Sequence, residues 1–498
     1  MLSKSKFILG QQCHKSLWLD AKNHEKTNPM DAAAIERLDA GNEVGEAAKK
    51  LFPGGIDIPF IYDGGYQKIC DLTSKAIEDG KQTIYEASFI EDGVFIRADI
   101  MNKTSKGWDV YEVKSATKIQ PYHKEDLSLQ WYILGQVKNL ELHNAYMITL
   151  NNTYVKKGVI DYEELLNKDC LTEDVHVKQK QIQKELNEMK KILASNDEPS
   201  IDIGAHCKKP HGCGYFDKCW PEDHKNINSV FRLYRYNLDK KLDLYNLGID
   251  TLDKIGANIS LTGTQQNQIK ALELNEPIIN ITKLKSFKNS IQYPISYFDF
   301  ETFTDAIPQF DGQRPHMQMP FQYSLHIQRS PKDVMDSDTS HFEFIADTNK
   351  DPRRAIAESM IKNIPQEGSI MAFNESFEKS CIKSLAEHCP DLSAELLALN
   401  ERFVDLIDPF RGGGYYHSDF KGSFSIKSVL PAICPNEKHY KDLEINNGGM
   451  ASLAYKEMRE QGDKEIQTSR EKLFEYCHMD TYAMYAIYKE LLKIIDRG

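Results

Sequence analysis

The chain has 498 residues, 41% of them hydrophobic and 27% charged, which fits a globular protein of two or three domains. Its net charge of −12 argues against a protein coated in basic surface. It does not exclude nucleic acid as a partner, because carboxylate-rich metal sites make the total negative while local grooves stay basic. No apolar run is long enough to span a membrane and the N-terminus lacks a signal peptide's apolar core, so we expect a cytoplasmic protein with no membrane partner.

The N-terminal part predicts alternating helices and strands, and hence an α/β fold that is α+β in part. Residues 31–52 have the apolar stripe of an amphipathic helix, which ends at Pro53, Gly54 and Gly55. The later elements predicted here are helices over 67–80, 125–137 and 172–195, strands over 85–90, 93–103 and 108–116, and a strand pair over 145–155.

Residues 93–116 predict a hairpin that carries three polar side chains. Asp99 lies on its first strand, and Glu112 and Lys114 alternate on its second strand, so these two side chains face the same way. The two carboxylates could hold Mg²⁺ or Mn²⁺, and the lysine could polarise the attacking water and offset phosphate charge. The alternative is a surface hairpin with a Glu–Lys pair, because the pattern is short and degenerate.

This hairpin and its surroundings resemble the RecB-like branch of the PD-(D/E)XK nuclease superfamily that carries an iron–sulfur cluster, which includes the CRISPR-adaptation and AddB-type repair nucleases. That branch has one N-terminal cysteine, the hairpin motif, a Gln/Tyr helix and three cysteines at the end of the domain. The matching residues are Cys13, then Asp99 with Glu112 and Lys114, then Gln130 with Tyr132, then Cys207, Cys213 and Cys219. The resemblance covers residues 1–225 and implies a restriction-endonuclease-like core.

The chain departs from that branch in two places. Gly45 stands where the family often has a helical histidine as a metal ligand, and Glu46 beside it is the candidate substitute. The three close cysteines follow a C-x5-C-x5-C spacing, which is wider at the first gap than the commoner form. Four thiolates suit a [4Fe–4S] cluster or zinc, and three close cysteines with one distant cysteine favour the cluster, as a structural staple, over zinc.

Residues 226–290 predict a helical linker between two domains. Its helices surround a tight LGID turn, which resembles half of a helix–hairpin–helix unit that holds a nucleic-acid backbone by main-chain N–H groups. A helical spacer is an equal alternative.

Residues 291–498 predict a second α/β domain, which begins with the buried strand ISYFDFETF over 295–303. Asp299 and Glu301 lie on the same face of this strand. Carboxylates on an aromatic strand are costly to bury as charges, so a divalent metal between them is the simplest explanation. The later strands are predicted over 320–328, 341–347 and 368–374, with helices over 352–363, after 374 and at the C-terminus.

This domain resembles the DEDD exonuclease superfamily on the ribonuclease-H-like fold, which includes proofreading domains and ribonuclease D-like enzymes. Its D-x-E motif is matched by Asp299 and Glu301, and its Tyr-x3-Asp motif by Tyr476 and Asp480. Its Asn-x-x-Phe-Asp motif is matched from Asn374 to Glu378, with glutamate in place of the usual aspartate.

The resemblance implies a role for each matching residue. Two Mg²⁺ or Mn²⁺ ions would be held by Asp299, Glu301, Glu378 and Asp480. Tyr476 would orient the attacking water, and Asn374 would orient the end of the nucleic acid or fix the local turn. Asp405 and Asp408 are alternative acids, or else parts of a solvated turn.

The loop over 411–427 mixes basic and aromatic side chains, which suits contact with a single strand through its backbone and stacked bases. The candidate nucleic-acid ligands in it are Arg411, Tyr415, Tyr416, Lys421 and Lys427, and Tyr132 joins them from the N-terminal domain. An ordinary surface loop is the alternative.

Together these patterns predict a metal-dependent nuclease with two candidate active sites. The C-terminal site would be a 3′–5′ exonuclease and the N-terminal site a RecB-like nuclease, acting on single-stranded DNA or DNA ends in repair, defence or nucleic-acid processing. One alternative is an RNA-processing exonuclease. Another is a nucleic-acid-binding protein whose N-terminal nuclease site is inactive.

Overall fold

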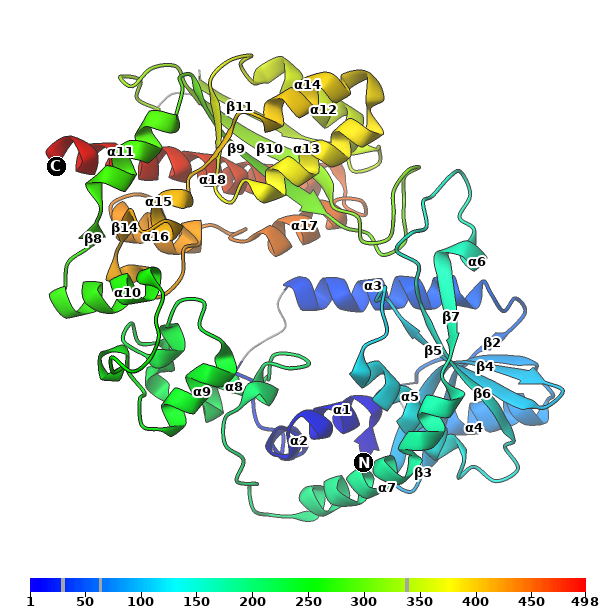
Figure 1. The fold of residues 1–498 in the computed structure, drawn as a ribbon. Coiled ribbons are helices and arrows are strands. Elements are labelled where there is room, and N and C mark those ends of the chain that lie inside the picture. The colour runs from blue at the N-terminus through cyan, green and yellow to red at the C-terminus, as the bar shows by residue number, and fades with distance from the viewer. Residues whose placement is uncertain (28–31, 62–64, 336–339) are drawn as a thin grey trace. The chain divides into compact units, whose positions relative to one another are not determined.

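The computed structural model describes residues 1–27, 32–61, 65–335 and 340–498. They form two compact units, Met1–Trp220 with Asp305–Met317 and Pro221–Thr304 with Gln318–Gly498. Each unit has its own mixed sheet with helices packed on it, so the chain is α/β (Figure 1). Residues 226–290, expected as a separate linker, fall within the second unit, and no helix in the described ranges is both long and apolar enough to cross a membrane.

Unit 1 is built on a seven-stranded sheet in the order β2-β3-β4-β5-β6-β7, with β1 paired to β4. Its strands are β1 (Leu2–Ser3), β2 (Ile56–Asp57), β3 (Thr83–Glu91), β4 (Val94–Thr104), β5 (Gly107–Lys114), β6 (Leu142–Leu150) and β7 (Leu166–Cys170). Its helices are α1 (Lys4–Gln12), α2 (His14–Ala21), α3 (Ala32–Lys49), α4 (Gly65–Glu78), α5 (Pro121–Leu134), α6 (Tyr162–Leu165), α7 (Thr172–Ala194) and α8 (Phe216–Cys219).

The predicted hairpin is formed by the antiparallel strands β4 and β5. The preceding β3–β4 turn contains Asp92 and Gly93, both at positive φ, which is the mirror-image turn that Asp-Gly pairs favour. The strand pair predicted over 145–155 is wrong in its second half. Only β6 is a strand there, because the Asn151 side chain accepts the backbone N–H of Thr153 and turns the chain out of the sheet.

Unit 2 is built on a five-stranded sheet in the order β11-β10-β9-β12-β13. These strands are β9 (Ile295–Phe303), β10 (Met319–Gln328), β11 (His341–Ile345), β12 (Ser369–Ala372) and β13 (Phe403–Asp405), and a separate two-stranded sheet pairs β8 (Ile278–Ile279) with β14 (Tyr415–Tyr416). The first three strands are antiparallel, whereas β12 runs parallel to both β9 and β13. The strand that carries Asp299 and Glu301 is therefore central.

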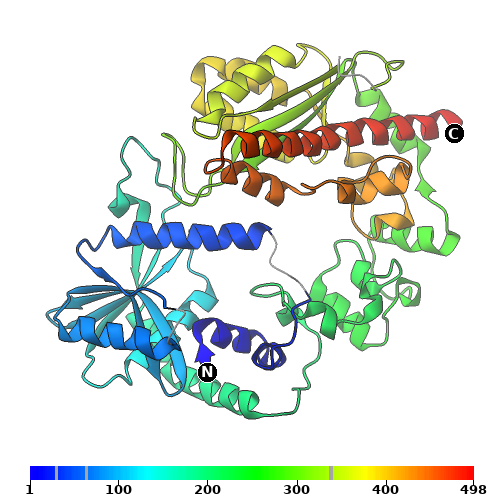
Figure 2. The same ribbon diagram turned by 180° about the vertical axis from the view of Figure 1, so that it is seen from behind.

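Helices pack on both faces of the unit 2 sheet (Figures 1 and 2). The helices of this unit are α9 (Leu238–Asn246), α10 (Gly263–Leu274), α11 (Ile281–Ser290), α12 (Pro352–Asn363), α13 (Ser376–His388), α14 (Ser393–Asn400), α15 (Asp408–Arg411), α16 (Ile426–Ile433), α17 (Gly448–Glu457) and α18 (Asp463–Arg497). The face with Phe298 and Phe300 packs on α12, α13 and α14 and is apolar. The other face is crossed by the long helix α18, and this is the face on which the acidic residues of β9 lie.

Candidate metal centres

Three carboxylates meet where α18 crosses β9 in unit 2. Asp299 and Glu301 come from β9 and Asp480 comes from α18. Their ligand oxygens all lie within 4.8 Å of one another. The alternation of the strand places the first two on one face. The structure brings Asp480 to the same point, as the resemblance predicted.

The fourth predicted ligand, Glu378, lies in the first turn of α13 with only 3% of its surface exposed. Burial raises the pKa of its carboxyl to about 8 and that of Asp480 to about 6. Burial and repulsion by the neighbouring carboxylates raise the pKa values of Asp299 and Glu301 well above their usual range. Oε2 of Glu378 and Oδ2 of Asp480 are buried without a hydrogen-bond partner among the described residues, as expected of oxygens that ligate a cation.

Two tyrosines support the charged form of Asp480. The hydroxyl of Tyr440 donates a hydrogen bond to its Oδ1 over 2.7 Å. Tyr476 lies one turn earlier on α18, and both tyrosines lower the pKa of Asp480 against the effect of burial. Tyr476 was predicted from its spacing, whereas Tyr440 was missed because it lies 40 residues from its partner.

Lys427 was predicted to contact nucleic acid and lies beside the acidic cluster. Its ammonium group sits over the rings of Tyr440, at 5.2 Å, and Tyr476, at 5.4 Å, and donates to the backbone oxygen of Asn446. Its charge lowers the pKa values of the cluster, but less than burial raises them. The side chain is exposed, so it marks the rim of the site.

The strand-to-helix junction before Glu378 is held by Asp405. Its carboxylate accepts the backbone N–H groups of Asn374, Glu375 and Ile407 over 2.8 to 3.2 Å. Asn374 has a positive φ of 79°, and the guanidinium of Arg411 donates to its side-chain oxygen at 3.4 Å. Asp405 is thus engaged in shaping the turn, and the structure brings together Asn374 and Arg411, which were predicted separately as nucleic-acid ligands.

The basic-aromatic loop over 411–427 is more ordered than predicted. Tyr415 and Tyr416 form β14, and only 5% and 1% of their surfaces are exposed. The prediction that these two rings stack on bases is therefore wrong, because they pack against Phe420 instead. A pocket beside the loop is lined by Tyr234, Arg235, Phe373, Asn374, Ile407, Arg411 and residues 422–426, while Lys421 is exposed.

The hairpin of unit 1 carries a second cluster, centred on Glu112. The ammonium of Lys4 donates to both carboxylate oxygens of Glu112 over 2.9 Å, and Gln130 and Lys114 donate to them over 2.6 and 2.5 Å. Lys114 also donates to Asp126 at 2.6 Å. Asp99 accepts the backbone N–H of Val113 at 2.6 Å. The four predicted residues of this site meet, and the structure adds Lys4 and Asp126.

The charges of this second cluster nearly cancel, with three carboxylates and two ammonium groups. Burial disfavours the ammonium of Lys4, but Asp126, Glu112 and Asp99 raise its pKa, so it is charged. Burial likewise disfavours the carboxylate of Glu112, and the two lysines hold its pKa below the usual value. The chain's own lysines therefore supply the positive charge that a metal would bring. Asp126 lies one helical turn before Gln130, and this spacing could have shown that both face the same cluster. No feature of the sequence around Lys4 indicated that its side chain would reach Glu112.

Glu46, expected as the first metal ligand, points elsewhere. Its side chain is 70% exposed and pairs with Lys49 at 2.6 Å. Glu86 on β3, at a positive φ of 59°, acts electrostatically on Asp99 and pairs with Arg97 at 2.7 Å. Glu86 is thus the better candidate for a further carboxylate ligand. Tyr132, expected to bind nucleic acid, is partly buried against the core of unit 1.

The four predicted cluster ligands line one cavity, and none of the four is in a disulfide bond. They are Cys13, Cys207, Cys213 and Cys219. Burial raises the pKa of Cys13, and the backbone N–H groups of Ser16 and Lys15 at the start of α2 lower it. The backbone N–H of Tyr215 donates to the Cys213 sulfur at 3.4 Å. Four sulfurs around one cavity, with N–H donors aimed at them, fit a group held by thiolates.

Sequence comparison finds similarity to proteins without an assigned function. A domain of unknown function, DUF2779, matches residues 296–425, which contain Asp299, Glu301 and Glu378. Uncharacterized protein UU173 of Ureaplasma parvum is 28% identical over 274 residues, covering 51% of this chain and 38% of that protein. The MG366 homolog of Mycoplasma pneumoniae is 26% identical over 282 residues, covering 52% and 42%. The chain spans less than half the length of these relatives.

Proposed function

We propose that unit 2 is a metal-dependent 3′–5′ exonuclease of the DEDD type on a ribonuclease-H-like fold. The observation that carries this proposal is the convergence of four buried carboxylates from β9, α13 and α18, two of which have an oxygen without a hydrogen bond. The sheet order, with the Asp-x-Glu strand first in sequence and central in space, supports the same fold. Mg²⁺ or Mn²⁺ bound there would supply an activated water and stabilise the leaving oxygen.

The chain's own residues then have separate tasks. Asp299, Glu301, Glu378 and Asp480 hold the cations. Tyr440 donates a hydrogen bond to Asp480 and, with Tyr476, favours its charged form. Lys427 at the rim offsets the charge of the scissile phosphate. The pocket that contains Asn374 and Arg411 receives the strand, with Arg411 as its cationic contact to phosphate.

For unit 1 we propose a RecB-like PD-(D/E)XK domain that contributes nucleic-acid binding, with a [4Fe–4S] cluster held by its four cysteines and zinc as the alternative. The arrangement of Asp99, Glu112, Lys114 and Gln130 supports this assignment. The two ammonium–carboxylate contacts from Lys4 favour an inactive nuclease site over an active one. A cytoplasmic location fits this proposal, since cysteines that act as thiolate ligands stay reduced in a reducing compartment.

End-labelled substrates test the exonuclease. Purified protein with Mn²⁺ or Mg²⁺ is incubated with single-stranded DNA, duplex DNA and single-stranded RNA that carry a 5′ label. We expect a ladder of products shortened from the 3′ end, and its absence for Asp480→Asn. The matched control is Asp463→Asn, an exposed aspartate on the same helix. Digestion that persists in Asp480→Asn would refute the assignment, and the preferred substrate decides between DNA and RNA.

Metal analysis tests the cluster in unit 1. Anaerobically purified protein should be brown and contain about four iron atoms per chain. Cys213→Ser should lose the colour, whereas Cys170→Ser, an exposed cysteine outside the cavity, should keep it. A colourless protein with one zinc ion per chain would favour the zinc alternative.

A further inference from the structure

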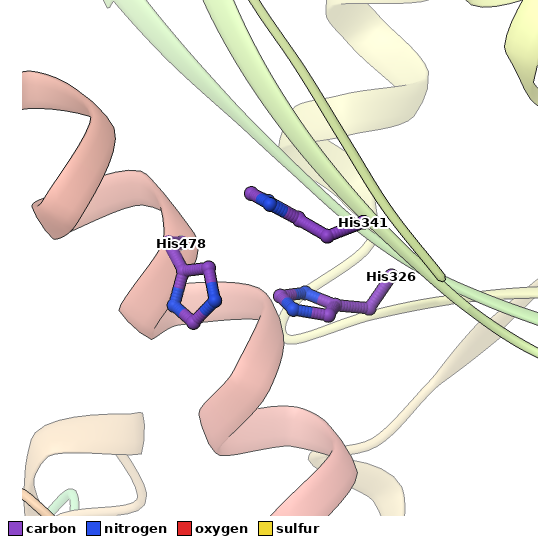
Figure 3. Close-up of side chains that lie close together, drawn as sticks. All are labelled: His326, His341 and His478. Carbon is purple, nitrogen blue, oxygen red and sulfur yellow. The ribbon is translucent and has the colours of Figure 1, made fainter. Parts of the chain in front are cut away.

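Three imidazole rings come together on the α18 side of the unit 2 sheet, from three different elements (Figure 3). His326 lies on β10, His341 lies directly opposite it on β11, and His478 lies on α18. The ring centroids are 4.3 to 4.7 Å apart, and one nitrogen from each ring lies within 4.8 Å of the other two. The two strand rings stack and the helical ring meets them edge-on (Figure 3).

Buried hydroxyl groups orient two of these rings. Thr481 is fully buried, and its hydroxyl lies 2.8 Å from Nδ1 of His326 and 2.7 Å from the hydroxyl of Ser324. The Ser324 hydroxyl in turn lies 2.9 Å from Nε2 of His341. Histidines that bind metal commonly engage their other ring nitrogen in this way, which fixes the tautomer and the orientation of the ring. For His326 the arrangement leaves Nε2 as the ligand atom.

The chemistry of the three rings selects the kind of cation. Neutral imidazole nitrogens suit zinc and similar transition metals, whereas carboxylates suit Mg²⁺ and Mn²⁺. Glu343, two residues after His341 on β11, has a carboxylate oxygen 3.9 Å from Nε2 of His341. It can balance part of the charge of a bound divalent ion.

We propose that His326, His341 and His478 form a zinc site separate from the carboxylate cluster. Nitrogens that share a zinc ion at about 2.0–2.1 Å lie roughly 3.4 Å apart, so ion binding turns one strand ring out of the stack and draws the three nitrogens together. The bound ion ties the β10–β11 edge of the sheet to α18. Because His478 is two residues from Asp480, this tie fixes the helix that presents the acidic ligand.

Zinc binding is measured on the full chain in the presence of excess Mg²⁺, which occupies the carboxylates. Zinc content is compared among the wild type, His341→Gln, His478→Gln and the control His388→Gln, a histidine on α13 outside the cluster. We expect the wild type and the control to bind one more zinc ion per chain than the other two variants. Equal zinc content in all four proteins would overturn the proposal.

Cobalt distinguishes this site from the four cysteines. Co²⁺ in the histidine site should add visible d–d absorption that His341→Gln lowers, while the bands of cobalt bound by the cysteines, including the near-ultraviolet sulfur-to-cobalt charge-transfer bands, persist. If a histidine variant fails to fold, Thr481→Val provides a second test, because it keeps all three histidines. It should weaken zinc binding by roughly 10- to 100-fold. An unchanged zinc dissociation constant in Thr481→Val, with cobalt bands unaffected by the histidine variants, would overturn the proposal.

Discussion

The two carboxylate clusters are made of the same residue types and differ in what neutralises them. In unit 1, Lys4 and Lys114 donate directly to Glu112, and the formal charge of the cluster is close to zero. In unit 2, the hydrogen-bond donor to Asp480 is the neutral hydroxyl of Tyr440, and the cation Lys427 stays exposed at the rim. The unit 2 cluster therefore has more to gain from a bound cation than the unit 1 cluster, which already contains its positive charge.

The pKa values express the same difference. The pKa of Glu112 is lowered in spite of burial, although those of Asp99 and Asp126 beside it are raised. In unit 2 the pKa values of Asp299, Glu301, Glu378 and Asp480 are all raised. Carboxylate motifs in a sequence can therefore mark an ion-pair network in one domain and an acidic cluster without a directly bound ammonium group in another. The neighbours that decide between them come from distant parts of the chain.

The largest expected effect is on catalysis. Asp299→Asn should lower the exonuclease rate by roughly 1,000-fold, because metal ions contribute several kcal/mol of transition-state stabilisation and each 1.4 kcal/mol is about tenfold. Glu112→Gln should change the rate less than about threefold if the unit 1 site is inactive. Single-turnover digestion of a labelled single strand measures both. A larger loss of exonuclease rate in Glu112→Gln than in Asp299→Asn would show instead that the unit 1 site is the active one.

The unit 2 cluster should also make stability depend on pH in the absence of metal. The pKa of Glu378 is raised from 4.5 to about 8, so the folded state holds this proton more tightly than the unfolded state does. Its contribution is complete below pH 4.5 and is lost as the pH rises to about 8, a change on the order of 5 kcal/mol. Thermal melts in EDTA should therefore show a falling Tm over this range, and Mn²⁺ should restore it most at high pH. Glu378→Gln should flatten the profile, and a profile unaffected by this substitution would contradict the account.

Removal of Lys4 should make the unit 1 cluster resemble the unit 2 cluster. Lys4→Met leaves Glu112 and its neighbours without one counter-charge, which should cost about 3 kcal/mol of unfolding free energy. Mn²⁺ should then stabilise the variant more than the wild type, measured by Tm in an Asp299→Asn background that removes the other site. Lys6→Met, on the same helix and paired with Asp20 at the surface, is the control. Equal Mn²⁺ responses in Lys4→Met and Lys6→Met would show that Lys4 does not stand in for a cation.

The smallest effect concerns the strand that enters the unit 2 pocket. Arg411→Ala removes one phosphate contact, so affinity for single-stranded DNA should fall roughly 3- to 10-fold and the salt slope by about 0.7. Tyr416→Phe should leave binding unchanged, because the ring is buried and its hydroxyl has no hydrogen-bond partner among the described residues. Fluorescence anisotropy at several salt concentrations separates these outcomes. A stronger effect from Tyr416→Phe than from Arg411→Ala would show that the Tyr416 hydroxyl contributes to binding the strand.

The sequence predicted the features that depend on local spacing. The alternation along β9 predicted that Asp299 and Glu301 lie on one face of the strand. The i,i+4 spacing on α18 predicted that Tyr476 and Asp480 lie on one face of the helix. The meeting of the four cysteines rested on a resemblance, since Cys13 lies almost 200 residues before the others.

Features that depend on tertiary neighbours escaped prediction. Lys4 reaches Glu112 across 108 positions, and the three histidines lie on three elements with no shared pattern. Tyr415 and Tyr416 were predicted to be exposed binding residues, because the sequence alone does not show that they form a strand paired with β8. Burial and charge balance decide these cases, and both are set by packing.

The most direct test is a Mn²⁺ titration followed by electron paramagnetic resonance, which counts tightly bound ions in the wild type, Asp299→Asn with Asp480→Asn, and Glu112→Gln. The account predicts about two tight ions per chain in the wild type and in Glu112→Gln, and their loss in the unit 2 double variant. Retention of both ions in the double variant, with their loss in Glu112→Gln, would contradict it.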